Sequence, residues 1–399
     1  MRRYFRRSAA LLLCAMALLF SGCERLYIGS YISVTEHEEL KLSTSYNEGY
    51  YEVHTYAGIR NALLELISAG REEGVIRTLD YEGSVQDDVA RICLDVTRES
   101  AIGSYTVEFI THSVSRILSY YEIRFHISYR LDETERAGVQ NTVSLAELYR
   151  LVDESLCDRQ EKLAVQIATL SVSEQTMLDY VKGFYQQNPD RLSDRPSVSV
   201  SFFPSEEHVS KIVELSFSYP RQADEERERL KQIENAVSGM MDTWQNLSSP
   251  EYALCCCKAL ADGVTAQESG STAYDALVAH HADSEGFAMA YRLLCSRSGV
   301  SCQVVEGKKN GRSHYWNILK LGQDYYHVDC SAGGNEALYF LLPDEALLGE
   351  YWWDVDRYPR CQGVLSAEQV MELCYGADET TESLPDGGGG IIPPLLELP

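Results

Sequence analysis

Three residues in the last third of the chain carry the side chains that acyl chemistry requires. Ser284 stands at the start of an Ala- and Leu-rich helical segment, and His314 and Asp329 lie in two later strand-like segments. A hydroxyl, an imidazole and a carboxylate in contact form a nucleophile, a general base and the group that orients the base. The residue types therefore predict a site for attack on an ester or amide, if the fold brings the three together.

The strands expected around His314 and Asp329 bring those two side chains together. With a two-residue loop between the strands, Leu321 pairs with Asp324, and the pairing can be counted outward from there. Side chains alternate between the two faces of a strand, so one face is shared by His314, Trp316, His327 and Asp329. His314 and Asp329 are then diagonal neighbours, about 7–8 Å apart at the backbone and within side-chain reach. An imidazole held by a carboxylate is the expected arrangement.

Three sequence blocks contain these residues in order along the chain. They are Ser284-Glu-Gly-Phe-Ala-Met-Ala290, His314-Tyr-Trp-Asn317 and Tyr325-Tyr-His-Val-Asp329. Together the blocks resemble the transglutaminase-like superfamily, and the resemblance covers about residues 223–375. It implies a papain-like fold with a cysteine at a helix N-terminus and a histidine and an aspartate on adjacent strands. His314 and Asp329 match that histidine and aspartate, and Ser284 takes the place of the cysteine.

The serine makes catalysis unfavourable. Beside a helix N-terminus and an imidazolium, a thiol becomes a thiolate, whereas a serine hydroxyl in the same field stays protonated. Ser284 therefore needs His314 to remove its proton, and a site shaped for sulfur misplaces the smaller oxygen; about 1 Å of misplacement can cost on the order of 100-fold in rate. No other cysteine is expected to substitute. Cys295 lies about 16 Å further along the same helix, Cys330 points to the opposite face of its strand, and Cys255–Cys257 belong to another helix.

Simpler interpretations of the same residues stay open. Ser284 can cap its helix, a role for which Asp283 competes. His314 can be an ordinary packed histidine, and Trp316 can either line a groove for an extended ligand or pack in the core. A metal site on the face shared by the two histidines and Asp329 lacks a fourth ligand at suitable spacing, so we expect neither a metal nor another cofactor.

The first 23 residues are typical of an export signal. Four arginines precede a short apolar run, Ala9–Phe20, and small residues then lead to Cys23. The run is too short to span a bilayer, which needs about 20 residues. The stretch resembles a bacterial lipoprotein signal, which implies that Cys23 is lipidated and anchors the protein to the cell membrane with the polypeptide on the extracytoplasmic face. The alternative is an ordinary secretory signal.

Charge and cysteine placement exclude several other classes of function. The formal net charge is −25, which disfavours nucleic acid as a partner because phosphate binding needs a basic surface. The chain has twelve cysteines but no CxxC pair, and three of them are consecutive, Cys255–Cys257, within an apolar helical segment. Neither a zinc site of ordinary spacing nor a disulfide framework fits this pattern. Buried free thiols are the expected state.

The region between residues 56 and 221 predicts an internal repeat of two α-β-α-β-β units. Phe125-His-Ile-Ser-Tyr129 and Leu215-Ser-Phe-Ser-Tyr219 occupy corresponding places in the two units. In the first unit we expect helices at 57–69 and 84–99 and strands at 74–81, 104–110 and 121–129. The fold class is therefore α+β, with the papain-like domain at the C-terminal end. The expected divisions are 1–23 signal, 24–55 linker or strand, 56–135 and 136–221 repeat units, 222–375 transglutaminase-like domain and 376–399 disordered tail.

These observations predict a membrane-anchored extracellular lipoprotein whose transglutaminase-like domain is catalytically impaired. Its expected role is that of a pseudoenzyme that binds a peptide or a cell-surface or secreted protein. The alternative is a hydrolase or acyltransferase that uses Ser284, His314 and Asp329 as a triad on ester or amide substrates. In a third hypothesis the repeat units bind the partner and the whole chain is an adhesion protein.

Overall fold

The computed structural model describes residues 45–47, 49–168, 171–332 and 339–375. The described residues form two compact units, one made of those up to 97 together with 108–129, the other of 98–107 together with those from 130 to 375. The predicted lipidation site Cys23 and the predicted tail 376–399 lie outside the described residues. None of the described helices combines the length and the apolar character that a membrane crossing requires.

The N-terminal unit is a five-stranded sheet with the order β1-β2-β3-β5-β4. Its elements are β1 Ser45–Asn47, β2 Tyr50–Val53, α2 Tyr56–Ser68, β3 Glu73–Leu79, α3 Val85–Glu99, β4 Val107–Ile117 and β5 Tyr120–Tyr129. Helix α2 begins after Thr55, whose side chain accepts a hydrogen bond from the backbone N–H of Gly58. Ile59, Leu63 and Leu66 are spaced three and four residues apart, so they share one face of α2 and are buried against the sheet.

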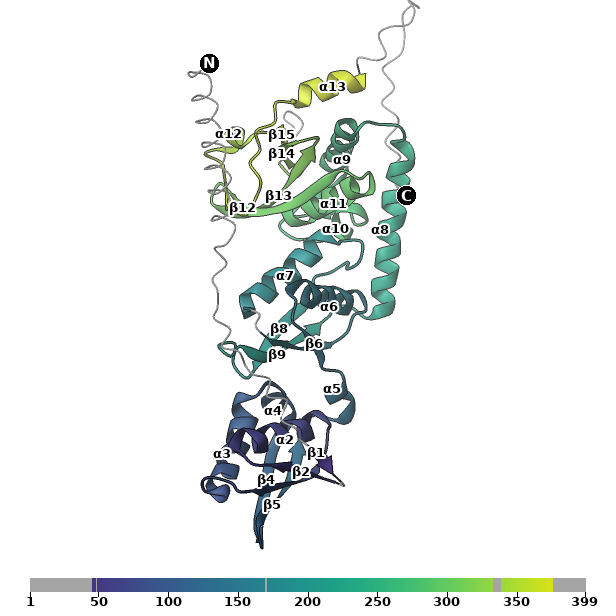
Figure 1. Ribbon diagram of the computed structural model, residues 1–399. Helices are drawn as coiled ribbons and strands as arrows, with labels where there is room; N and C mark the ends of the chain where they lie inside the picture. Colours follow the sequence, from purple (N-terminus) through teal and green to yellow (C-terminus); the bar gives the residue numbers. More distant parts are fainter. Residues whose placement is uncertain (1–44, 48, 169–170, 333–338, 376–399) are drawn as a thin grey trace, which may run out of the picture. The chain divides into compact units, whose positions relative to one another are not determined.

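The second unit begins with another sheet, of four strands in the order β6-β7-β9-β8. Its elements are α4 Ala101–Thr106, α5 Glu133–Ala137, β6 Gln140–Thr142, α6 Leu145–Cys157, β7 Lys162–Ala168, α7 Glu174–Gln187, β8 Ser197–Phe203 and β9 Ser210–Ser218. Helices α6 and α7 cover the same face of this sheet (Figure 1). Helix α4 packs on β9, where the hydroxyl of Tyr105 donates to Glu214 at 2.7 Å.

The two sheets share one connectivity. In each, the first pair of strands flanks a helix and is parallel, β2 with β3 and β6 with β7. The next neighbours, β3 with β5 and β7 with β9, are antiparallel. The predicted order α-β-α-β-β is therefore incomplete, because a short strand precedes the first helix of each unit. Strands β2 and β6 are too short to show an alternating apolar pattern, and whether the units arose by duplication stays a prediction.

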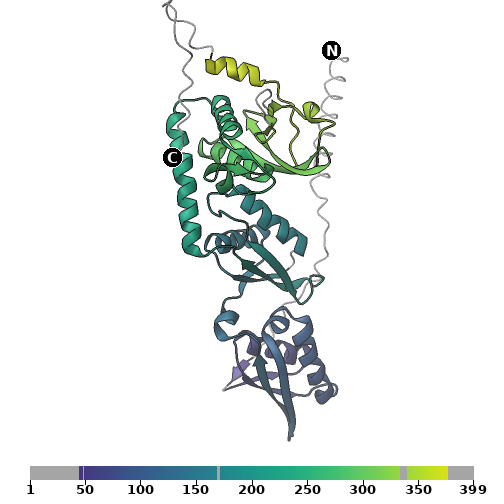
Figure 2. The same cartoon turned by 180° about the vertical axis from the view of Figure 1, so that it is seen from behind.

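The C-terminal part of the second unit packs helices beside a five-stranded sheet of order β15-β14-β13-β12-β16. Its helices are α8 Ala223–Thr243, α9 Ser249–Gly263, α10 Ala273–Leu277, α11 Ser284–Arg297, α12 Asp344–Leu347 and α13 Ala367–Tyr375. The strands of this sheet are β12 Ser301–Lys309, β13 Arg312–Leu321, β14 Asp324–Asp329, β15 Tyr339–Leu342 and β16 Tyr351–Trp353, while β10 Thr265–Ala266 and β11 His281–Ala282 pair with each other in a separate parallel ribbon. Helix α11 lies along β12 and β13, as both sides of the ribbon diagram show (Figures 1 and 2). The predicted pairing of β13 with β14 is confirmed: Leu321 pairs with Asp324, and Asn317 with Val328.

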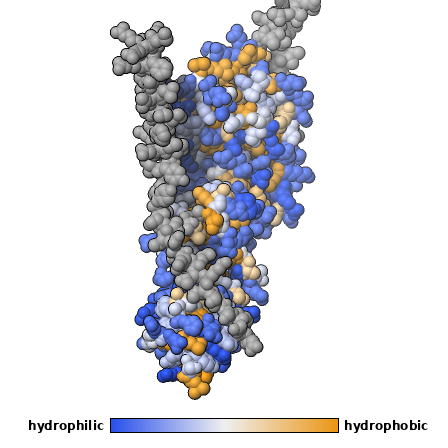
Figure 3. Space-filling view, viewed as in Figure 1, coloured by the Kyte–Doolittle hydropathy of each residue, from blue (hydrophilic) through white to orange (hydrophobic). Residues whose placement is uncertain are grey.

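The sheet has an apolar layer on each face. On the α11 side, the core includes five buried cysteines, Cys256, Cys257, Cys295, Cys302 and Cys330. Every cysteine among the described residues is a free thiol, and burial raises the pKa of Cys295, Cys302 and Cys330 well above the ordinary value. These thiols therefore pack as small hydrophobic groups. On the outer surface, hydrophilic residues dominate the face seen in Figure 3, and apolar residues form small separate groups.

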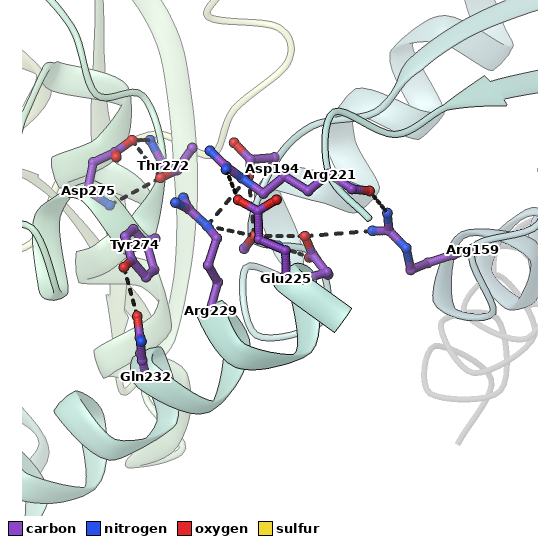
Figure 4. Close-up of polar contacts among 11 residues, drawn as sticks. Arg159, Asp194, Arg221, Glu225, Arg229, Gln232, Thr272, Tyr274 and Asp275 are labelled. Atoms are coloured by element: carbon purple, nitrogen blue, oxygen red, sulfur yellow. Dashed lines mark hydrogen bonds and ion pairs between the residues drawn. The ribbon is translucent and has the colours of Figure 1, made fainter. Parts of the chain in front are cut away.

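A polar network joins α8 to the segment that precedes β8 (Figure 4). The guanidinium of Arg221 donates to Asp194 at 2.6 Å, and Arg229 lies 3.6 Å from the same carboxylate. The guanidinium of Arg229 also stacks on the ring of Tyr274 in α10, 3.5 Å from its centroid. Glu226 is buried and accepts from both the backbone and the hydroxyl of Ser193. Side chains of α8 thus bind both the second sheet region and the helix that precedes the candidate site.

Candidate active site

Ser284 is the first residue of α11, and the residue before it caps the helix. The carboxylate of Asp283 accepts the backbone N–H groups of Glu285 and Gly286 at 2.9 and 3.1 Å. Its second oxygen accepts the hydroxyl of Ser271 at 2.5 Å. The capping interpretation of Ser284 is therefore wrong, because Asp283 does the capping. The hydroxyl of Ser284 instead accepts the backbone N–H of Tyr315 at 3.2 Å.

The start of α11 is held in place by close backbone contacts. A Cβ at Gly286 would collide with the carbonyl oxygen of Gly270 and approach the Cβ of Ala282 to 2.9 Å. The same carbonyl accepts the backbone N–H of Asp283 at 3.1 Å. Further along, the side chain of Asn317 in β13 donates to the carbonyl of Ala288 in α11 at 2.9 Å. Only glycine fits at position 286, and these bonds fix the helix start beside β13.

His314 and Asp329 form a close pair. The Nε2 atom of His314 lies 2.6 Å from a carboxylate oxygen of Asp329, and the two side chains are 15% and 3% exposed. The hydroxyl of Tyr351 donates to the same oxygen at 2.8 Å, while the backbone N–H and hydroxyl of Ser331 donate to the other. Burial alone raises the pKa of a carboxyl, but the hydrogen bonds from His314, Ser331 and Tyr351 outweigh it and hold the pKa of Asp329 below its ordinary value. The carboxylate is charged and orients the imidazole.

The nucleophile and base positions are adjacent but not hydrogen-bonded. The hydroxyl of Ser284 accepts the backbone N–H of Tyr315, the residue that follows His314. The hydroxyl and the imidazole therefore lie on neighbouring parts of α11 and β13. Among the residues that the structure describes, neither ring nitrogen of His314 forms a hydrogen bond with that hydroxyl. The Nδ1 atom of His314 has no hydrogen-bond partner in this part of the chain. The structure thus assembles the imidazole–carboxylate half of a triad and leaves the serine bound to an amide.

Side chains of α7 contact the elements beside the site, a contact that no pattern in the sequence indicated. The ammonium of Lys182 binds Glu306 in β12 at 2.6 Å, and the hydroxyl of Tyr315 donates to the same carboxylate at 3.2 Å. One helical turn later, the amide of Gln186 lies 3.5 Å from Glu285, the residue after the serine. Burial raises the pKa of Glu285. Lysine and glutamine four residues apart on α7 therefore face β12, the strand paired with β13, and α11, the helix that begins with Ser284.

Trp316 and His327 lie behind the His314–Asp329 pair. Trp316 is 1% exposed and packs with Tyr351 and Trp353, so it belongs to the core and does not line a groove. Its indole N–H donates to Nδ1 of His327 at 3.0 Å. His327 therefore does not join His314 and Asp329 in a ligand set; its Nε2 lies 2.9 Å from Asp344.

One cluster of metal-type ligands occurs in the described residues, formed by His327, Asp344 and Cys361, whose ligand atoms lie within 4.8 Å of one another. An indole N–H can only donate, so Nδ1 of His327 must hold a lone pair toward Trp316. In the neutral ring the proton is then on Nε2, the nitrogen that faces Asp344. A metal ligand needs a free lone pair at that nitrogen. These three residues do not fit a metal ion in this arrangement.

Comparison with known proteins gives structural neighbours only. No family model matches the chain, and no curated protein matches it. A solved structure described as a TGase is 11% identical, with 55% of this chain and 67% of that chain covered and a TM-score of 0.26. A candidate cysteine protease from Cytophaga hutchinsonii is also 11% identical, with 38% and 67% covered and a TM-score of 0.23. A candidate protease from Parabacteroides distasonis is 6% identical, with 67% and 44% covered and a TM-score of 0.21.

Proposed function

We propose that residues 222–375 form a transglutaminase-like domain in which Ser284 replaces the nucleophilic cysteine, and that this domain binds a peptide or protein segment with little or no acyl transfer. The protein acts at the cell surface, anchored through a lipid on Cys23. The observation that carries the proposal is the hydrogen bond from the backbone of Tyr315 to the hydroxyl of Ser284. That hydroxyl is engaged by an amide, and the imidazole of His314 makes no hydrogen bond with it.

Two further features support weak catalysis. The carboxylate of Asp283 occupies the backbone N–H groups of Glu285 and Gly286, so these groups are not free to stabilise an oxyanion. The same carboxylate places negative charge at the helix N-terminus, where a neutral serine must develop negative charge during attack. Both effects raise the barrier for a hydroxyl nucleophile, while neither prevents a substrate-like segment from binding.

A second candidate function is a hydrolase or acyltransferase that uses the triad. It is favoured by the state of the pair: Asp329 is charged, and it holds His314 with Nδ1 free of hydrogen-bond partners among the described residues. Hydrogen bonds between a nucleophile and its base are often long before substrate binds and tighten in the complex. This function requires the hydroxyl of Ser284 to leave the backbone of Tyr315 and to donate to Nδ1 of His314 when substrate is bound.

The binding function is tested with the purified full chain and a fluorescent mixture of glutamine-containing peptides. Wild type is expected to bind peptides, measured by anisotropy, without incorporating an amine or releasing ammonia. Ser284→Trp fills the site and is expected to lower the affinity at least about 10-fold, which corresponds to 1.4 kcal/mol. Ser298→Trp, at the exposed opposite end of α11, is the matched control and is expected to bind as wild type does. Equal binding by wild type and Ser284→Trp would refute the proposal.

The alternative function has its own assay. A fluorophosphonate probe reacts with an activated serine, so it is applied to wild type and Ser284→Ala between pH 5 and pH 9. We expect equal, background labelling of the two proteins. Labelling of wild type that disappears in Ser284→Ala would establish the hydrolase function and reject the impaired one.

A further inference from the structure

A second histidine–aspartate pair lies beside the candidate site, in the apolar layer on the sheet face that also carries His314 and Asp329. His327 is 1% exposed, and its Nε2 lies 2.9 Å from a carboxylate oxygen of Asp344. The backbone N–H of Cys361 donates to the same oxygen at 3.2 Å. On its other side, His327 accepts the indole N–H of Trp316 at 3.0 Å. The contacts from Asp344 through His327 to Trp316 form what we call the indole support.

The indole support tolerates only the neutral form of His327. The N–H of Trp316 is a donor without acceptor capacity, so it needs the lone pair on Nδ1. Protonation of the ring places a second N–H at Nδ1, opposite the indole N–H. Two donors 3.0 Å apart repel each other, and the hydrogen bond is lost. The contact with Asp344 survives protonation and becomes stronger, because a carboxylate attracts imidazolium.

Trp316 connects the indole support to the candidate site. Its ring stacks against the imidazole of His314, with centroids 6.2 Å apart and planes 25° apart. It also meets the ring of Tyr351 edge-on at 5.2 Å, and the hydroxyl of Tyr351 donates to Asp329. A Cβ at Gly307, the residue paired with His314, would lie 2.6 Å from the Trp316 ring, so the indole fills the available space. Movement of this indole therefore shifts the residues that hold His314 and Asp329.

We infer that the indole support is an acid-sensitive device: protonation of His327 releases Trp316, and the release loosens the packing of His314 against its aromatic neighbours. The transition belongs to mildly acidic conditions. Burial lowers the pKa of His327 from its ordinary value of 6.5, and the contact with Asp344 opposes this shift without reversing it. The inference about Trp316 stands by itself; its effect on ligand binding rests on the proposed function.

Other charged groups near His327 do not replace it as the sensor. Asp344 is the carboxylate that faces it from α12. Cys361 faces the same cluster, and burial raises the pKa of its thiol to about 12, so it stays neutral. Trp353 in β16 contributes only an uncharged ring, with its centroid 4.8 Å from that of His327. Asp329, two residues along β14, is bound to His314 and keeps its charge at mildly acidic pH.

The sign of the effect on stability follows from the direction of the pKa shift. The folded pKa of His327 lies below the unfolded value, so the unfolded chain takes up a proton first as the pH falls. The stability that the neutral ring provides is complete above about pH 6.5 and decreases below it. A variant that lacks the imidazole of His327 should therefore lose less of its unfolding free energy as the pH falls.

The test uses the full chain labelled with 15N-tryptophan, in which each of the four indoles gives one N–H resonance. Trp316→Phe identifies the resonance of Trp316. On acidification from pH 8 to pH 5, this resonance is expected to move upfield by about 1 ppm, with a midpoint below pH 6.5. His327→Gln is expected to remove the transition, because its side-chain oxygen accepts the indole N–H at every pH. His126→Gln changes an exposed histidine in the other unit and is expected to titrate as wild type does.

The Cε1 resonance of His314 gives a second readout, and in wild type it is expected to show an inflection at the same midpoint. A Trp316 resonance that stays constant while His327 titrates would overturn the inference. A transition of the Trp316 resonance with the same midpoint in wild type and in His327→Gln would also overturn the inference, whether that transition is local or a general unfolding. No ligand or activity is needed, so failure of the proposed function leaves this result unaffected.

Discussion

Ser284→Cys is expected to gain acyl-transfer activity at least about 100-fold above wild type. The new thiol lies at the N-terminus of α11, where the carboxylate of Asp283 opposes the field of the helix, so the imidazolium of His314 is the group expected to lower the thiol pKa. The backbone N–H of Tyr315, which now donates to the serine oxygen, can donate to a thiolate instead. The measurement is incorporation of a fluorescent amine into a glutamine-containing peptide, with iodoacetamide labelling to report the thiolate fraction.

Matched variants show whether the gain comes from the assembled site. Ser284→Cys combined with His314→Ala should lose both the transfer activity and the rapid labelling at neutral pH, because the thiol is then without its base. Ser298→Cys, at the opposite end of the same helix, introduces an exposed thiol and should give no transfer. Transfer activity that persists in Ser284→Cys after the imidazole of His314 is removed would show that His314 is not the base of this site.

Asp329→Asn, introduced into Ser284→Cys, is expected to reduce kcat/KM by about 10³- to 10⁴-fold, a loss of the size seen when the acid of a triad becomes an amide. Asp329 accepts from His314, Ser331 and Tyr351 with its two oxygens. An asparagine offers one oxygen and turns its NH₂ group toward one of these donors. The control is Asp324→Asn at the exposed turn between β13 and β14, which should leave kcat/KM unchanged.

The same substitution has a pH signature. The folded pKa of Asp329 is depressed, so its charged form adds stability above its ordinary pKa of 3.8, and this stability is lost as the pH falls through the folded value. Asp329→Asn is therefore expected to lower the free energy of unfolding at pH 7 and to have little effect in strong acid. A difference in unfolding free energy that stays constant between pH 7 and pH 2 would show that folding does not lower the pKa of Asp329.

The pairing of β13 with β14 could be predicted because it depends on local features. A two-residue turn fixes which residues face each other, and the alternation of side chains then places His314 near Asp329. The start of α11 was less well determined. Serine and aspartate are both good caps, and the competition between Ser284 and Asp283 depends on the backbone conformation at Asp283.

The parts that could not be predicted depend on packing between distant segments. Residues 104–110 were expected to form a strand, but the stretch divides between α4 and β4 after Thr106, and α4 packs on β9 instead. Lys182 and Gln186 lie about 100 residues before the serine, and nothing in their spacing indicates contact with β12 and α11. The contact between His327 and Asp344 likewise joins two elements that have no common pattern.

The backbone passes between the two compact units more than once, which limits where the gene can be truncated or exchanged. The backbone leaves the first unit after residue 97, returns at 108 and leaves again after 129. A gene fragment that ends at either early crossing carries an incomplete sheet, and one that begins at 130 lacks the α4 helix, whose Tyr105 binds Glu214. Exchange of the N-terminal unit between related genes as one uninterrupted stretch would therefore take α4 with it, and an expression boundary drawn at residue 130 would expose the surface that α4 covers.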